Sequence, residues 1–176
     1  TDFAADEDYP WMPGQFVWTG FDYLGEPTPY DTDSWPNHSS VFGIIDLASI
    51  PKDRFWLYRS QWRKDSPTLH LVPHWTWPGH EGENIPVVAY SSFDKAELFV
   101  NGVSQGIAVK AAPSGVSADP THPAPIAPDT ELMRRFRLIW PDVIYQSGEL
   151  KVVAYNSDGK PAAEQVVRTA GKPYAL

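Results

Sequence analysis

The stretch Glu97-Leu98-Phe99-Val100-Asn101-Gly102-Val103 decides the fold of the larger part of this chain. A run rich in strand-forming residues ends at Asn-Gly, a pair that accepts the positive φ angles of a type I′ turn, and Val103 begins the return strand. The stretch predicts a β-hairpin with a two-residue turn.

Similar short segments flank this hairpin on both sides. A second turn signal, Ser157-Asp158-Gly159, separates two further segments and predicts a second hairpin. In all we expect seven strands, at 70–75, 85–91, 96–100, 103–108, 136–140, 149–155 and 165–169. Seven short strands separated by turn residues are typical of a β-sandwich. The Pro- and Ala-rich stretch at about 110–132 reads as an insertion between strands.

The first 63 residues differ in composition from the rest. Seven of the eight tryptophans lie within residues 1–80, and several prolines and turn formers separate two apolar segments. We expect a buried strand at 14–21, a long loop at 22–40, and a helix that opens at Pro51 and runs to Trp62. The predicted domains are therefore 1–63 and 64–176.

Overall composition excludes several functions. A net charge of −8 argues against nucleic acid and against an anionic membrane surface as partners. The chain has no cysteine, which removes disulfides and thiolate metal sites. It also has no apolar run near the roughly 18 residues that a membrane span needs. The acidic residues at 1–9 do not resemble a signal peptide and look like sequence from the middle of a protein.

The segment Phe16-Val17-Trp18-Thr19-Gly20-Phe21-Asp22-Tyr23-Leu24-Gly25-Glu26-Pro27 resembles the last barrel strand and the following loop of glycoside hydrolase family 2 β-galactosidases of gut Bacteroidetes. The resemblance continues through residues 39–46 and 51–62, then through 69–77, 96–102 and 148–155. It implies the last strand, loop and helix of a (β/α)₈ barrel followed by an immunoglobulin-like sandwich, a mostly β chain. Residues 110–132 are its main departure.

The same resemblance implies a function and a place for the chemistry. Family members hydrolyse terminal β-galactosides with retention, using two glutamates held about 5–5.5 Å apart. Both glutamates belong to earlier barrel strands, so we expect no catalytic residue in this chain and no activity of the chain alone. No cofactor and no metal is implied, and a periplasmic or secreted location is suspected.

Four residues are the expected substrate contacts: Trp18, Asp22, Tyr23 and Glu26. By the resemblance, Trp18 is the indole platform under the galactosyl ring, and the alternative is a tryptophan of the barrel core. Asp22 and Glu26 either accept hydrogen bonds from sugar hydroxyls or cap turns of the loop. We do not expect them to form the catalytic pair.

A non-catalytic carbohydrate-binding or structural sandwich is the rival function. In that reading Trp75, Trp77 or loop aromatics bind glycan, although a core or interface position is the commoner fate of such rings. His70, His74 and His80 invite a metal site, but His70 and His74 lie about 13 Å apart if both belong to one strand, which is too far for a shared ion.

The expected partners follow from these readings. They are a galactoside or oligosaccharide in the intact enzyme, and either the remainder of the barrel or another copy of the chain. Without barrel partners, the apolar side chains around Phe16, Phe21 and the helix at 51–62 need cover from the sandwich or from a second copy.

Overall fold

The computed structural model describes residues 2–25, 39–112 and 129–173. Contacts within the chain divide it into two compact units, residues 1–58 and residues 59–176. Helix α2 (Asp53–Trp62) spans the limit between them. We keep the boundary after residue 63, at the end of this helix, as a proposal.

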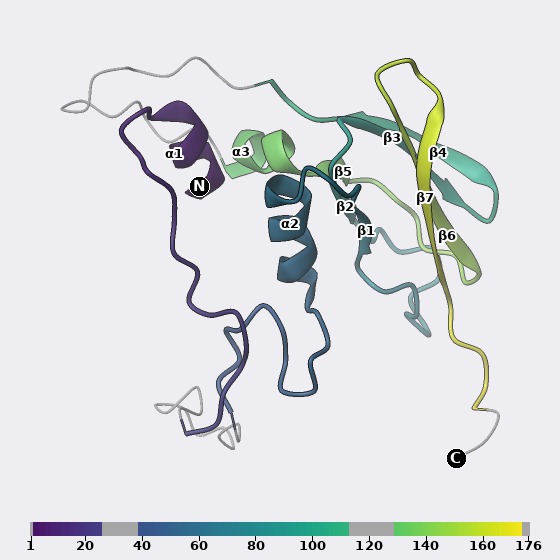
Figure 1. Cartoon of the computed structure of the whole chain (residues 1–176). Coiled ribbons are helices and arrows are strands. Elements are labelled where there is room, and N and C mark those ends of the chain that lie inside the picture. Colours follow the sequence, from purple (N-terminus) through teal and green to yellow (C-terminus); the bar gives the residue numbers. More distant parts are fainter. Residues whose placement is uncertain (1, 26–38, 113–128, 174–176) are drawn as a thin grey trace. The chain divides into compact units, whose positions relative to one another are not determined.

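The second unit is a sandwich of two antiparallel sheets (Figure 1). One sheet has the order β1-β2-β5, with β1 at Leu69–Val72, β2 at Val87–Ser91 and β5 at Leu138–Trp140. The other has the order β4-β3-β6-β7, with β3 at Lys95–Val100, β4 at Val103–Val109, β6 at Glu149–Tyr155 and β7 at Pro161–Arg168. The seven strands confirm the predicted immunoglobulin-like, mostly β fold.

Both predicted hairpins are present. Asn101 and Gly102 have φ angles of 49° and 81°, as a type I′ turn requires, and Val100 pairs with Val103 across it. Strands β6 and β7 pair from Glu149 with Arg168 to Tyr155 with Pro161. Local sequence was sufficient here because each turn closes on residues next to it in the chain.

Alternation along the strands builds the core. Every second side chain is buried in β6, and the same alternation runs along β3. The cluster between the sheets includes Leu71, Trp75, Val87, Ala89, Ala96, Leu98, Val100, Leu138, Trp140, Val143, Tyr145, Leu150, Val152 and Ala154. Aromatic residues from loops therefore complete a core that the strands begin.

Two helices were not predicted. Helix α1 covers Asp2–Asp8, and helix α3 covers Asp129–Phe136. Helix α3 starts inside the predicted insertion and includes Phe136, which we had assigned to the following strand. Its residues are mostly good helix formers, and the buried Phe136 anchors it. The rest of the insertion, at 113–128, lies outside the described residues.

The predicted strand at 14–21 is not a regular strand in this structure. Its single ladder contact is an isolated parallel bridge between Phe21 and Ile45. A barrel strand needs neighbours along both edges, and the described residues supply one short neighbour. Helix α2 also begins later than predicted, at Asp53, because Pro51 pairs with Ile45 in a separate bridge.

Strand β1 ends at Val72 rather than continuing to Trp75. The next residue is Pro73, joined by a cis peptide bond, and proline has no N–H for the ladder. His74, Trp75 and Trp77 thus lie in the connection after β1. The predicted strand at 70–75 was therefore too long, and His70 and His74 do not belong to one strand.

Candidate functional site

The first unit holds its expected site residues on a short parallel pairing of two extended segments. The N–H groups of Ile44 and Ile45 donate to the carbonyls of Thr19 and Gly20, both at 3.0 Å. The N–H of Asp22 returns to the carbonyl of Ile45 at 2.9 Å. Residues 19–22 are therefore fixed against the segment that leads into α2.

Asp22 is buried, and both of its carboxylate oxygens have partners. The Lys52 ammonium lies 2.5 Å from Oδ2, and the N–H of Gly43 donates to Oδ1 at 2.8 Å. Burial by itself raises the pKa of this carboxyl, but the hydrogen bonds from Lys52 and Gly43 outweigh it and hold the pKa below its ordinary value. Asp22 therefore stays ionised near neutral pH and serves as an acceptor, not as a proton donor.

Gly43 is required by this close approach. A Cβ at this position would lie 2.3 Å from the Asp22 nitrogen and 2.5 Å from the Phe21 carbonyl carbon. Only glycine lets the two segments come this close. The sequence shows Gly43 inside an apolar run, but nothing local marks it as the residue opposite Asp22.

Trp18 presents an exposed ring, with 72% of its surface accessible. The Tyr23 and Trp18 rings are in a T-shaped contact with their centroids 6.3 Å apart, and the Phe42 and Tyr23 rings are in a similar contact at 5.8 Å. The Trp18–Thr19 peptide bond is cis. The indole is thus a free apolar face that is oriented by a second aromatic ring.

The expected substrate contacts are only partly brought together. Trp18 and Tyr23 are in ring contact, the Asp22 carboxylate is held by Lys52 and Gly43, and Glu26 lies outside the described residues. Sequence reasoning missed Lys52 and Gly43, which hold the Asp22 carboxylate. Their role depends on residues about 20 to 30 positions apart, so no local pattern could reveal it.

Many apolar side chains of the first unit are exposed. Phe16 is fully accessible, and the other large exposed ones are Trp11, Met12, Trp18, Phe21, Leu24, Val41, Leu47 and Ile50. Within the described part of this unit, Ala4 and Leu57 are the buried apolar residues. Such a surface on one small unit is typical of a face that packs against more protein.

The rings that suggested a glycan-binding strip belong largely to the sandwich core. Trp75 is fully buried, and its Nε1–H donates to the carbonyl of Gln146 at 3.0 Å. The Trp77 indole stacks on His74 at 4.5 Å and donates to its carbonyl. Trp75 therefore cannot face a sugar, and the core interpretation is confirmed for it.

Metal and membrane features can be assessed only where the chain is described. Over those ranges no three His, Cys, Asp or Glu side chains gather as a metal site would require. Likewise, none of the described helices has the length and apolar character to cross a bilayer.

Comparison with known proteins places the chain in a family. The domain of unknown function DUF4982 matches residues 82–163. Beta-galactosidase BoGH2A of Bacteroides ovatus is 45% identical over 97% of this chain, which spans 16% of that protein. A putative beta-glucuronidase of Formosa agariphila is 43% identical over 56% of the chain, which spans 10% of that protein.

Solved structures agree with these relatives. A beta-glycosidase from Bacteroides vulgatus matches 94% of the chain at 38% identity with a TM-score of 0.69, and the match covers 17% of that protein. A glycosyl hydrolase family 2 member from Bacteroides cellulosilyticus matches 97% of the chain at 26% identity with a TM-score of 0.70, over 23% of its length. The chain belongs to glycoside hydrolase family 2, and it corresponds to the C-terminal region that contains the DUF4982 domain.

Proposed function

We propose that the intact protein is a retaining glycosidase that removes terminal β-galactosyl groups, and that this chain supplies one wall of its sugar site and a supporting sandwich. The observation that carries the proposal is the exposed Trp18 ring. It contacts the Tyr23 ring, and it precedes a backbone pairing in which the Asp22 carboxylate is bound by Lys52. Galactose as the substrate rests on the relative named a beta-galactosidase.

Trp18 suits a sugar because a pyranose presents a C–H face that stacks on an aromatic ring. Tyr23 adds an aromatic edge and a phenolic hydroxyl beside the indole. Asp22 retains lone pairs that can accept a hydrogen bond from a sugar hydroxyl. Because its carboxylate is buried and bonded to the Gly43 N–H, its main role in the proposal is to hold residues 22 and 43 together. We retain Glu26 as the fourth proposed contact.

The catalytic pair in this proposal lies in other barrel strands of the intact protein. Retention needs one protonated and one ionised carboxyl group on either side of the glycosidic bond. Asp22 does not meet either role, since Lys52 and Gly43 occupy its oxygens and lower its pKa. The chain alone should therefore not turn over a chromogenic galactoside, and turnover at enzyme-like rates would overturn this assignment.

The decisive experiment compares Trp18→Ala with wild type in the intact protein, on chromogenic β-galactoside and β-glucuronide substrates. Losing a stacked ring removes about 2–4 kcal/mol of binding, which is roughly a 30- to 1000-fold fall in kcat/KM. Trp18→Phe should retain part of it. Trp11→Ala is the matched control, because it removes another exposed tryptophan of the same unit.

The two substrates separate the galactosidase proposal from a glucuronidase. Hydrolysis of the galactoside with little action on the glucuronide supports the galactosidase proposal. The reverse preference means that the substrate is a glucuronide, and it leaves the proposed role of Trp18 unchanged. A Trp18→Ala protein with unchanged kcat/KM on every hydrolysed substrate would refute the platform itself.

A further inference from the structure

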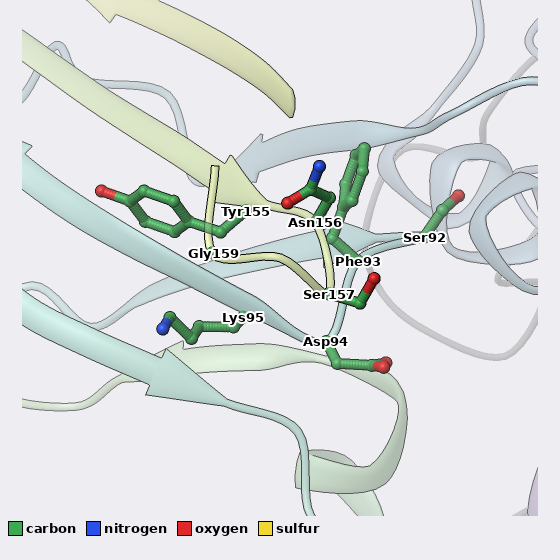
Figure 2. Close-up of a pocket in the computed structure, with 8 residues that line it drawn as sticks. All are labelled: Ser92, Phe93, Asp94, Lys95, Tyr155, Asn156, Ser157 and Gly159. Carbon is green, nitrogen blue, oxygen red and sulfur yellow. The ribbon is translucent and has the colours of Figure 1, made fainter. Parts of the chain in front are cut away.

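The sandwich carries a pocket of about 420 Å³ at the ends of two connections (Figure 2). One side is the β2–β3 connection and the start of β3, and the other is the end of β6 and its turn into β7. We call it the turn pocket, lined by Ser92, Phe93, Asp94, Lys95, Tyr155, Asn156, Ser157 and Gly159. Its volume lies within the range of small-molecule sites, about 300–1,000 Å³.

Both sides of the turn pocket are held by hydrogen bonds within the fold. The Asn156 Oδ1 atom accepts from the N–H groups of Asp158 and Lys160, at 3.1 and 2.9 Å. Opposite, the Phe93 N–H donates to the Ser91 hydroxyl at 2.9 Å. A ligand would therefore meet turns that are already ordered, which reduces the entropic cost of binding.

The pocket combines apolar rings with polar groups. Phe93 is half-buried and packs against the sandwich core. Tyr155 lies directly opposite Lys95 in the ladder, with the Lys95 ammonium 5.5 Å from the ring centroid. Figure 2 shows the Phe93 ring and the Asn156 amide toward one end of the lining, and the Lys95 and Tyr155 side chains toward the other.

Several polar side-chain groups here are not used by the described fold. The side-chain Oδ1 of Asn156 closes its turn, but within the described residues no hydrogen bond engages the side-chain Nδ2 of Asn156 or the Ser157 hydroxyl. Together they offer two amide donors and one hydroxyl that can donate or accept. Such a mixture matches the hydroxyl groups of a sugar.

The charges around the pocket favour a neutral ligand. Asp94 and Lys95 are both in the lining, and their charges cancel. Two further charged residues adjoin the lining, and their charges have opposite signs. The Lys110 ammonium lies 3.8 Å from the Asp94 carboxylate, and the Glu97 carboxylate accepts a hydrogen bond from the Tyr155 hydroxyl at 3.0 Å. An acidic sugar would therefore find no net positive field.

We propose that the turn pocket is a carbohydrate-binding site for one or two neutral sugar units of an oligosaccharide. The sugar's C–H face lies against Phe93, and its hydroxyls bond to Asn156 and Ser157. This site is in the sandwich unit and uses none of the residues around Trp18. It therefore stands or falls independently of the galactosidase proposal.

The test is a two-dimensional amide NMR titration of the full 176-residue chain with methyl β-galactoside, cellotetraose and, separately, galacturonate. We expect saturable shifts of the Ser157, Gly159 and Asp94 amides with the neutral sugars. Ser157→Ala should weaken binding by about three- to tenfold, the equivalent of one hydrogen bond. Lys160→Ala is the matched control, since it alters an exposed side chain in the same turn that does not line the pocket.

Phe93→Leu tests the ring directly while keeping an apolar side chain against the core. Binding should fall by at least tenfold, with the remaining amide signals of the sandwich unmoved. The proposal is overturned if neither neutral sugar shifts these amides, if galacturonate binds more tightly than both, or if Phe93→Leu and Ser157→Ala bind like the wild-type chain.

Discussion

The link between Gly148 and Asn101 allows a quantitative test of the sandwich. Gly148 has a φ angle of 135°, and a Cβ added there would lie 2.0 Å from the Asn101 Oδ1 atom. That atom accepts a hydrogen bond from the Glu149 N–H at 2.8 Å, while the Asn101 Nδ2 group donates to the Ser147 carbonyl at 3.1 Å. Gly148→Ala should therefore strain the backbone and also expel the Asn101 side chain.

The expected magnitude has two parts. An L-residue in this conformation costs about 1–3 kcal/mol. Loss of the two Asn101 hydrogen bonds adds about 1 kcal/mol each. Gly148→Ala should thus lower the free energy of unfolding by about 3–5 kcal/mol, given the two estimates together.

The second variant, Asn101→Gly, keeps the positive φ angle of the turn and removes only the side-chain hydrogen bonds. It should cost about 2 kcal/mol. In the double variant the Asn101 side chain, which the new methyl group would displace, is already absent. The double variant should therefore lose as much free energy of unfolding as Gly148→Ala alone. The coupling free energy is then about 2 kcal/mol.

Urea unfolding followed by tryptophan fluorescence and by far-UV circular dichroism measures all four proteins. Both probes should report one transition of the sandwich. If the two single losses add in the double variant, the Asn101 side chain is not displaced by the new methyl group, and the geometric argument is wrong.

Three further predictions concern named side chains. Lys52→Met should raise the pKa of Asp22 in a carboxyl NMR titration, because burial then acts with less opposition. Since the folded pKa of Asp22 is depressed, its stabilising contribution is present above the unfolded pKa of about 3.9 and is lost as pH falls through the folded value; an unmoved titration would contradict this. Trp75→Phe should lower the free energy of unfolding of the sandwich, measured in urea, by about 2–4 kcal/mol, because it loses buried volume and the hydrogen bond to Gln146. A loss below half of this would contradict the prediction and show that the core repacks around the smaller ring. Gly43→Ala should also raise the pKa of Asp22, by displacing its carboxylate, while the urea midpoint of the sandwich stays unchanged.

The strands and turns of the sandwich could be read from the sequence because their signals are local. Asn101-Gly102 specifies its own backbone conformation, and the alternation from Glu149 to Tyr155 places every second side chain inward whatever the partner strand is. Helix α3 was missed because Pro- and Ala-rich sequence precedes it. Its signal occupies only eight residues.

The site was less accessible to prediction. Trp18, Asp22 and Tyr23 were proposed as substrate contacts from their motif, but their arrangement depends on contacts across the chain. Lys52 and Gly43 determine where the Asp22 carboxylate points, and neither carries a local signal for that role.

By itself the sequence determined that this chain contains a seven-stranded sandwich and a tryptophan-bearing motif of glycoside hydrolase family 2, because turn chemistry, alternation and motif are written in adjacent residues. Only the tertiary structure decided that Trp75 lies in the core while Trp18 is exposed, and that Lys52 and Gly43 hold the Asp22 carboxylate. The physical reason is that burial and charge pairing are properties of neighbours in space, and these neighbours are separated by tens of residues along the chain.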